Sequence, residues 1–330
     1  MFYNFDMTVI TLPYQPPAHP HLRRFDLRRD LGPVADLIEL CFSETLDEDG
    51  RRYIRHMRAT ARRSVLLSWA AMAQDQVSAP YSGFVWEDDG RVVGNLSHFA
   101  MPARGKKIYL IANVAVHPDY RKRGIARALT EAALTYSEEK KVDATWLHVR
   151  EENDPAHHLY QSLGFIERTR RTTWIAHSVP DVAPVLVGPM VGHRRGEHWP
   201  QQAYWLDQVH PPALDWYLPF KRNTFRPGLM GFFHRLLEDT YLKQWAVTWQ
   251  GQLLGTLTWQ RTNGSTDRLW LATPPEYEDT AIPALLAYAR WEFPARRKLS
   301  LEHPAGRGVE AFKTFGFTKE QTLIWMEHLA

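Results

Sequence analysis

The sequence has little of three features that would each place it in a special class of protein. Its 330 residues include one cysteine, Cys41, which excludes an intramolecular disulfide and favours a packed thiol in a reducing compartment. Its longest apolar stretch, near 65–73, is much shorter than the roughly 20 residues of a membrane helix. Its first residues lack the basic start of a signal peptide. We therefore expect a cytoplasmic protein that does not bind a membrane.

An excess of one charge is also missing. The chain has 40 Lys and Arg residues against 37 Asp and Glu residues, for a formal net charge of +3. A dedicated nucleic-acid binder would need a basic surface, so we expect no nucleic-acid partner. The 15 histidines form no His-Glu-x-x-His pattern and the cysteine is unpaired, which predicts that no metal is bound. A Gly-x-Ser-x-Gly elbow is absent as well.

What the chain does have is enough apolar sequence for a large core. Hydrophobic residues make up 44% of it and aromatic residues 12%, and its length is about twice that of a usual domain. Prolines and glycines crowd together between 177 and 200, as they do in a linker between domains. We therefore predict two domains, residues 1–178 and 179–330.

The second half repeats three short patterns of the first, in the same order. Gly251–Leu257 echoes Gly90–Leu96, Pro275–Tyr277 echoes Pro118–Tyr120, and Gly316–Phe317 echoes Gly164–Phe165. The offset between the members of a pair shrinks steadily along the chain, from 161 to 157 to 152 residues. Chance matches would scatter, so this order indicates a duplicated domain whose second copy has shorter loops.

Hydrophobic periodicity predicts alternating helices and strands in the first half, hence an α/β (α+β) fold. Strands are predicted over 22–27, 83–87, 91–99, 107–116, 144–149 and 166–175. Helices are predicted from Asp30, over 51–73 and 124–140, and over 154–163 with Asp154 as cap. Asp88-Asp89-Gly90 predicts a hairpin turn, because Gly accepts positive φ.

The helix predicted over 51–73 has a basic face. Arg51, Arg55, Arg58 and Arg62 are three or four residues apart, so they lie on one side of the helix. Long cationic side chains usually extend into water, which favours a solvated face. A groove for an acidic ligand is the alternative.

The most informative segment is Asn113–Ala126. A strand ends near Val116, three basic residues follow at Arg121–Arg123, and Gly124 opens a helix. Exposed backbone N–H groups at a helix start bind anions, and small residues let a ligand approach them. The segment therefore predicts a diphosphate cradle, although the nucleotide-triphosphate loop and the dinucleotide glycine fingerprint are both absent.

A second motif follows this segment at a suitable distance: Asn153, Ala156, Leu159-Tyr160 and Leu163-Gly164-Phe165. The first motif reads Val-x-Val-x-Pro-x-Tyr-Arg-x-x-Gly-x-Ala and the second Asn-x-x-Ala-x-x-Leu-Tyr-x-x-x-Gly-Phe. Together they resemble the GCN5-related N-acetyltransferase (GNAT) superfamily over about residues 22–176. The resemblance implies a mixed, splayed sheet flanked by helices, the fold of acyl-CoA acyltransferases, here present as a tandem repeat.

The resemblance also implies acetyl-CoA as cosubstrate, lodged where the strand ending at Val116 parts from the strand ending at Val149. Backbone groups of the first strand would hold the pantetheine arm as an added strand would. The amides of Arg121–Ala126 would hold the pyrophosphate. The implied binding residues are Val114, Ala115, Val116, Arg121, Lys122, Arg123, Gly124, Ile125, Ala126, Asn153 and Tyr160.

The implied chemistry is direct attack of an amine on the thioester carbonyl. The N–H of Val114 would stabilise the developing oxyanion, and Tyr160 is the candidate acid for the departing thiolate. The alternative role of Tyr160 is packing on the core. Asn153 would lie along the cofactor, and its alternative is a turn residue beside a helix cap.

The general base stays open at this point. Many relatives carry a carboxylate on the strand before the cradle, where this chain has Asn113, and an amide cannot accept the proton. Glu87, His98 and His148 are predicted on neighbouring strands and could act through water. Each could equally be an ordinary strand residue. An acceptor that is already neutral would need no strong base.

The second half lacks parts that the cofactor would need. Glu278 and Asp279 replace the basic loop, no glycine opens the next helix, Phe312 replaces the tyrosine, and Ala305 replaces the asparagine. Repulsion by the two acids would disfavour a pyrophosphate. We therefore predict a degenerate, non-catalytic copy. It holds nine of the 13 Trp residues, which either pack in its core or form one wall of an acceptor pocket.

Two functions are compatible with these patterns. The first is an N-acetyltransferase, active as a monomer or homodimer, that acetylates a primary amine on a small molecule or a peptide. The second is a non-catalytic acetyl-CoA sensor or interaction scaffold, suggested by Asn113 in place of a carboxylate. The resemblance does not select the acceptor, since the superfamily acts on antibiotics, polyamines, amino acids and protein amines.

Overall fold

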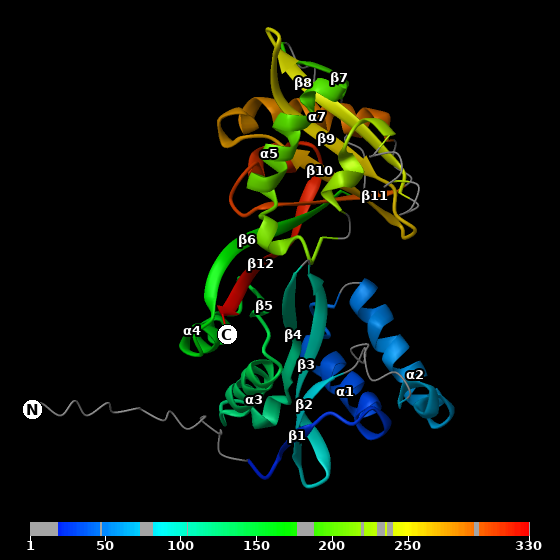
Figure 1. Cartoon of the computed structure of the whole chain (residues 1–330), viewed down its shortest axis with the longest axis vertical. Coiled ribbons are helices and arrows are strands. Elements are labelled where there is room, and N and C mark those ends of the chain that lie inside the picture. The colour runs from blue at the N-terminus through cyan, green and yellow to red at the C-terminus, as the bar shows by residue number, and fades with distance from the viewer. Residues whose placement is uncertain are drawn as a thin grey trace, which may run out of the picture. The chain divides into compact units, whose positions relative to one another are not determined.

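The structure is a computed structural model of the chain. It describes residues 19–46, 48–72, 82–103, 105–176, 188–218, 221–229, 235, 240–293 and 297–329. These residues form two compact units (Figure 1). Unit 1 is drawn from Met1–Met101, Gly105–Leu147 and His328–Ala330, and unit 2 from Pro102–Arg104 and His148–Glu327. None of the helices in the described ranges has the length and apolar composition needed to cross a membrane.

Unit 1 contains a mixed sheet with the strand order β1-β2-β3-β4-β5. The strands are β1 (Leu22–Arg24), β2 (Gly83–Asp88), β3 (Arg91–Ala103), β4 (Lys106–Val116) and β5 (Ala144–Arg150), which continues into unit 2. The helices are α1 (Leu27–Phe42), α2 (Glu48–Met72) and α3 (Ile125–Glu139). The pairs β1–β2 and β2–β3 are antiparallel, whereas β4 and β5 are parallel.

The side chains of β2 point alternately to the two faces of this sheet, and helices cover both faces. Val85 belongs to the core cluster that α1 and α2 build, whereas the ring of Phe84 lies 6.2 Å from that of Tyr136 in α3. Successive strand residues point to opposite faces, so α1 and α2 cover one face and α3 the other. Gly94 allows α3 to approach, because a Cβ there would lie 2.8 Å from Ile125.

The first helix begins earlier than the sequence pattern predicts. Asp26 caps α1, since its side chain accepts a hydrogen bond from the N–H of Arg28 at 2.9 Å. Asp30 lies inside the first turn and is fully buried, and its two carboxylate oxygens accept from Arg23 at 2.6 and 2.8 Å. The prediction of Asp30 as helix start was wrong because α1 begins at Leu27, although the carboxylate of Asp30 also accepts from the N–H of the cap residue Asp26 at 2.7 Å.

The basic face of α2 is divided between solvent and a neighbouring helix. Arg51, Arg55 and Arg62 are exposed. Arg58 instead donates to Asp36 at 2.6 Å and to Glu39 at 2.5 Å, both in α1. These contacts favour the solvated face over an acidic-ligand groove, with Arg58 tying the two helices together.

Unit 2 contains α4 (Asp154–Ser162) and the strand order β12-β6-β11-β10-β9-β8-β7. The strands are β6 (Ile166–Ala176), β7 (Met190–His193), β8 (Leu242–Trp249), β9 (Gln252–Gln260), β10 (Thr266–Ala272), β11 (Lys298–Pro304) and β12 (Phe317–Leu329). The helices that pack on them include α5 (Trp199–Val209), α7 (Glu278–Glu292) and α8 (Val309–Thr314). Trp245 and Val247 of β8 face α7, whereas Ala246 between them faces α5. This sheet, too, is covered on both faces.

Strand β6 shows how closely the two halves of the sequence are interleaved. It ends the first predicted domain, yet both its neighbours, β11 and β12, come from the second half. The predicted boundary near residue 178 lies outside the described residues, and the compact units divide within β5 instead. The ranges 1–178 and 179–330 therefore stay a prediction about the repeat.

The three repeated patterns have the same local geometry in both halves. The matched backbone angles are φ 45° and 77° at Asp89 and Gly90 against 49° and 80° at Gln250 and Gly251, and 87° at Gly164 against 76° at Gly316. Both Pro118–Tyr120 and Pro275–Tyr277 form a single 3₁₀ turn before a 15-residue helix. The predicted hairpin turn at Asp88-Asp89-Gly90 is present.

Candidate active site

The last part of β4 has an open edge. Its pairing with β5 ends at Ile111 opposite Leu147, although β4 itself continues to Val116. Asn113 has φ 52°, which interrupts the regular strand, and its carbonyl accepts from Nδ2 of Asn95 at 2.9 Å. Within the described ranges, the segment after Ile111 therefore has no strand paired on its β5 side, and it can accept an extended ligand there.

The start of α3 follows directly and is open to solvent. Arg121, Lys122, Arg123 and Gly124 are all exposed. Gly124 caps the helix with φ 78° and no side-chain hydrogen bond to the first turn, and a Cβ at this position would meet no atom within 4 Å. Free N–H groups at a helix start with open space above them form an anion-binding site. This is the geometry that a pyrophosphate cradle requires.

The basic side chains of this loop differ in how firmly they are held. Arg123 donates to the carbonyl of Asp119 at 2.9 Å, and its guanidinium lies 4.9 Å from the ring centre of Tyr120. Arg121 donates from Nε to the carbonyl of Val116 at 3.2 Å. Lys122 has φ 62° and makes no ion pair with any described residue. Two cations are thus positioned by the loop, and the third is free to meet an anion.

Cys41 of α1 lies against the end of β4, next to this basic loop. Its thiol is half-buried and donates to the carbonyl of Val116 at 3.3 Å. Burial raises the pKa of this thiol, and the neighbouring Arg121 acts in the opposite direction. The expectation of a packed thiol is therefore incomplete, because Cys41 packs against the end of β4 beside the basic loop.

Asn153 and Tyr160 lie on α4 in unit 2. Asn153 is the cap of this helix, and its Oδ1 accepts from the N–H of Ala156 at 3.3 Å. The prediction of Asp154 as cap was wrong, since Asp154 is the first helical residue and the asparagine before it makes the capping bond. This contact favours the capping alternative for Asn153.

Tyr160 is buried, with 6% of its surface exposed. Its ring meets that of Phe165 edge to face, with centres 5.9 Å apart. Burial raises the pKa of the phenol, so the hydroxyl stays protonated. It has no hydrogen-bond partner among the described residues, and it is thus able to donate to a ligand.

Two of the three candidate bases are unsuited to the role. Glu87 accepts from Arg23 at 2.6 Å and from Arg29 at 2.5 Å, and these bonds lower its pKa. His98 is 3% exposed, and burial lowers its pKa to about 4. A carboxylate engaged by two guanidiniums and an imidazole enclosed in the core are both poor proton acceptors.

His148 differs because its side chain reaches solvent. It is exposed, and its ring centre lies 4.9 Å from that of Trp325. The atoms packed around the ring desolvate it and so lower its pKa, and the charge of Arg150 acts in the same direction. His148 is therefore neutral at physiological pH and can accept a proton only weakly.

The corresponding helix start in the second half has a buried carboxylate as its first residue. Glu278, the first residue of α7, is buried and accepts from His303 at 2.9 Å and from Arg307 at 2.6 Å. Burial alone would raise the pKa of Glu278, but these two donors hold it below its usual value. Arg307 and His303 thus compensate the charge of Glu278 inside the protein, and the predicted repulsion of a pyrophosphate by Glu278 and Asp279 stays a prediction.

The tryptophans of the second half serve mainly as core residues. Trp205, Trp245, Trp259, Trp270 and Trp325 are buried. Trp249 and Trp291 are exposed by 43% and 68%. In the described part of the chain, no three His, Cys, Asp or Glu side chains are arranged to hold a metal ion.

Comparison with known proteins shows that part of the chain matches one family of sequences. Residues 38–165 match the sequence model of the Acetyltransferase (GNAT) family. Ribosomal protein bS18-alanine N-acetyltransferase of Escherichia coli (strain K12) is 38% identical over 81 residues, 24% of this chain and 55% of that protein. Mycothiol acetyltransferase of Tsukamurella paurometabola is 39% identical over 94 residues, 28% of this chain and 31% of that protein. The chain thus spans about half of the first relative and about a third of the second.

The likeness in structure extends over nearly the whole chain. The crystal structure of a GCN5-related N-acetyltransferase from Sphaerobacter thermophilus matches with a TM-score of 0.55 at 14% identity. The match covers 94% of this chain and 96% of that one. At this identity the likeness establishes the fold alone. The predicted GNAT fold, a mixed sheet flanked by helices, is therefore confirmed.

Proposed function

We propose that the chain is an N-acetyltransferase that uses acetyl-CoA to acetylate a primary amine by direct attack. The observation that carries the proposal is the uncapped, glycine-led start of α3 beside the open edge of β4. The match of residues 38–165 to the GNAT family supports it.

The residues of unit 1 would bind the cofactor mainly through their backbone. Val114, Ala115 and Val116 would pair with the pantetheine amides along the open edge of β4. The amides of Arg121–Ala126 would hold the pyrophosphate, and Lys122 would supply a free positive charge. Bound acetyl-CoA supplies the activated thioester. The N–H of Val114 would then donate to the oxygen that becomes negative when the amine attacks.

Tyr160 would protonate the departing thiolate. Its burial keeps the phenol neutral, and its hydroxyl has no described partner with which a thiolate would compete. A neutral phenol in a water-poor place is a suitable hydrogen-bond donor to a developing thiolate. Asn153 would act chiefly by capping α4 and so fixing the helix that carries Tyr160.

The amine would need little help to lose its proton. Glu87 and His98 are engaged in the protein, and His148 is a weak base. We therefore propose an acceptor that binds in its neutral form, with water, or His148 acting through water, taking the proton after attack. The rate should then rise with pH as the fraction of neutral amine increases.

The second half would be a degenerate copy that does not bind cofactor. The equal turn geometry at three places supports duplication. Glu278 supplies, from within the chain, the negative charge that a pyrophosphate would bring to the start of α7. Calorimetric titration should accordingly give one acetyl-CoA per chain, and a ratio of two would contradict the degenerate copy.

The names of the relatives include both kinds of acceptor that we propose. One relative is named for an alanine of a ribosomal protein and the other for mycothiol. A peptide amine and a small-molecule amine are therefore both reasonable acceptors for this chain, acting in the cytoplasm as a monomer or homodimer. No nucleic-acid or membrane partner is proposed.

The alternative is a non-catalytic acetyl-CoA sensor, which Asn113 in place of a carboxylate favours. A panel of peptide and small-molecule amines, incubated with acetyl-CoA while free thiol is measured, distinguishes the two functions. Thiol release that depends on one class of amine supports the enzyme. Tight acetyl-CoA binding without thiol release for any amine supports the sensor.

A further inference from the structure

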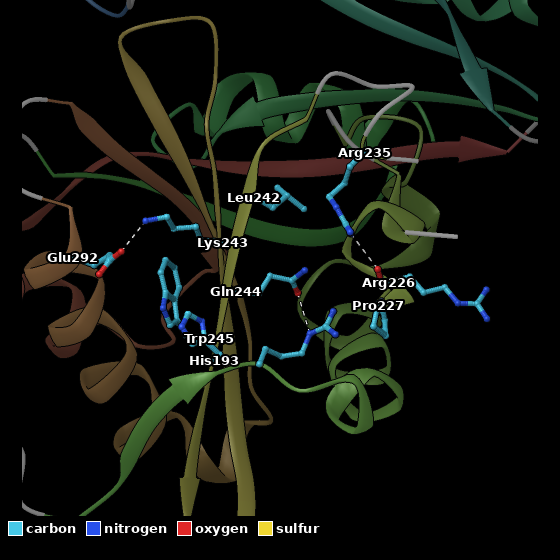
Figure 2. A pocket seen from close by; sticks show the side chains of 10 residues that line it. His193, Arg226, Pro227, Arg235, Leu242, Lys243, Gln244, Trp245 and Glu292 are labelled. Atoms are coloured by element: carbon cyan, nitrogen blue, oxygen red, sulfur yellow. Dashed lines mark hydrogen bonds and ion pairs between the residues drawn. The ribbon is translucent and has the colours of Figure 1, made fainter. Parts of the chain in front are cut away.

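A cavity of about 410 Å³ opens in unit 2 among β7, β8, the end of α7 and the segment near Arg226 (Figure 2). Small-molecule sites commonly have volumes of roughly 300 to 1,000 Å³. The charged and polar side chains that line it are Arg194, Arg226, Arg235, Lys243, Gln244 and Glu292. Trp245 and Leu242 add apolar surface. None of these residues belongs to the proposed acetyl-CoA site.

Two guanidinium groups meet in this cavity. Arg194 donates to the carbonyl of Phe225, and Arg235 donates to the carbonyls of Thr224 and Arg226 at 3.1 and 3.2 Å. The acceptors belong to three consecutive residues, so both guanidiniums contact the same short segment, and the charge of Arg235 is felt at Arg194. Burial and the nearby charge of Arg235 lower the pKa of Arg194 to about 10, which still leaves Arg194 positively charged at neutral pH.

The carboxylate in this cavity does not compensate these charges. Glu292 pairs with Lys243 at 2.7 Å; the pair is drawn as a dashed line in Figure 2. Arg194, Arg226 and Arg235 make no ion pair with any carboxylate in the described ranges. Two nearby guanidiniums that no described carboxylate pairs with repel each other, and a bound anion would remove that repulsion.

Arg194 is also held in place before any ligand arrives. Its Nε donates to Oε1 of Gln244 at 3.1 Å, and the same oxygen accepts from the buried Gln202 at 3.1 Å. The guanidinium lies 5.8 Å from the ring centre of Trp199. These contacts fix the direction of the fork, and a fixed fork binds an anion with little loss of side-chain entropy.

We propose that this cavity binds the phosphate group of a small molecule. A phosphate monoester carries a charge of about −1.5 to −2 at neutral pH, which matches two guanidiniums better than a single carboxylate does. Forked guanidiniums also bind phosphate oxygens in pairs. Leu242, on the same face of β8 as Gln244, provides an apolar wall for an organic group attached to the phosphate.

Calorimetric titration of the full chain with inorganic phosphate and with phenyl phosphate tests the site. Acetate at equal ionic strength serves as the carboxylate comparison. We expect both phosphates to bind more tightly than acetate. Arg194→Gln and Arg235→Gln should each weaken phosphate binding about tenfold or more. Arg195→Gln is the matched control, because Arg195 is the next residue along and its exposed side chain pairs with Glu197.

The comparison of inorganic phosphate with phenyl phosphate shows whether the site recognises the phosphate alone or also an attached organic group. Tighter binding of phenyl phosphate means that the apolar wall contributes, and equal binding means that the phosphate head alone is recognised; both support the site. The proposal is overturned if neither phosphate binds, if acetate binds equally well, or if Arg195→Gln weakens binding as much as Arg194→Gln. Thermal unfolding of each variant verifies that it is folded.

Discussion

Cys41 and Arg121 hydrogen-bond to the same oxygen, the carbonyl of Val116, at 3.3 and 3.2 Å. The thiol of α1 and the first cation of the proposed cradle therefore share an acceptor at the end of β4. As Cys41 is the single cysteine, its reactivity reports on this place alone.

We expect acetyl-CoA to protect Cys41 from alkylation. A ligand seated along β4 and the basic loop would cover the half-buried thiol, whose raised pKa already slows its reaction. The rate of modification by N-ethylmaleimide, followed by mass spectrometry, should fall several-fold with saturating acetyl-CoA. Cys41→Ser should bind acetyl-CoA like the unmodified chain. An unchanged alkylation rate would place the cofactor elsewhere.

Gly124→Glu should abolish acetyl-CoA binding without preventing folding. The added side chain has open space, so the structural cost is the left-handed backbone, about 1 kcal/mol. Its carboxylate would repel the pyrophosphate. Gly90→Glu is the matched control, with φ 77° and equally open space at a hairpin turn. Titration with acetyl-CoA should show at least about a tenfold loss for the first variant and none for the second.

His98 should make the fold sensitive to acid. Burial lowers its pKa from 6.5 to about 4, so below pH 6.5 the unfolded chain binds a proton that the folded chain does not. Stability from this group is complete above about pH 6.5 and is lost as the pH falls to about 4, by up to about 3 kcal/mol.

The test of this pH dependence is a difference between variants. Urea unfolding between about pH 7 and pH 4 should show a smaller loss of stability for His98→Gln than for the unmodified chain. His56→Gln, at an exposed position of α2, should behave like the unmodified chain. Equal losses in all three proteins would mean that His98 titrates normally.

Glu278→Gln should destabilise unit 2. The change keeps one acceptor oxygen, but it removes the buried negative charge beside His303 and Arg307 and replaces the oxygen that accepts from Nε of Arg307 by an amide donor, which costs roughly 2 kcal/mol or more. Glu310→Gln on α8 is the control, since its carboxylate is largely exposed and pairs with Lys313 at the surface. Its effect should stay under about 0.5 kcal/mol by urea unfolding. Similar losses for both would show that Glu278 is not an internal counter-ion.

The sequence was a good guide where one local pattern decides the structure. The turn at Asp89-Gly90 and the cap at Gly124 need positive φ, and a glycine at each place predicts it. It was a poor guide where distant residues decide. Asp30 lies inside the first turn, where it pairs with Arg23 and accepts from the N–H of Asp26, and the charge of Glu278 is compensated by Arg307 from the turn after β11.

Local sequence patterns also do not predict the order of the strands or the phosphate cavity. The insertion of β6 between β11 and β12 depends on pairings across more than 120 residues, which periodicity along one strand cannot reveal. Arg194 and Arg235 are 41 positions apart, and the fold brings both to the carbonyls of one short segment, at Thr224 and Phe225. The net charge of the sequence does not indicate that these two arginines lie near each other.

The most direct test of the central claim is the rate of amine acetylation by the unmodified chain and by Tyr160→Phe at saturating acetyl-CoA. The account predicts acetylated product from the unmodified chain, and about a hundredfold lower kcat for Tyr160→Phe with unchanged acetyl-CoA affinity. Tyr204→Phe, at an exposed tyrosine of α5, should keep full activity. Tight acetyl-CoA binding with no acetylated product for any amine would contradict the account.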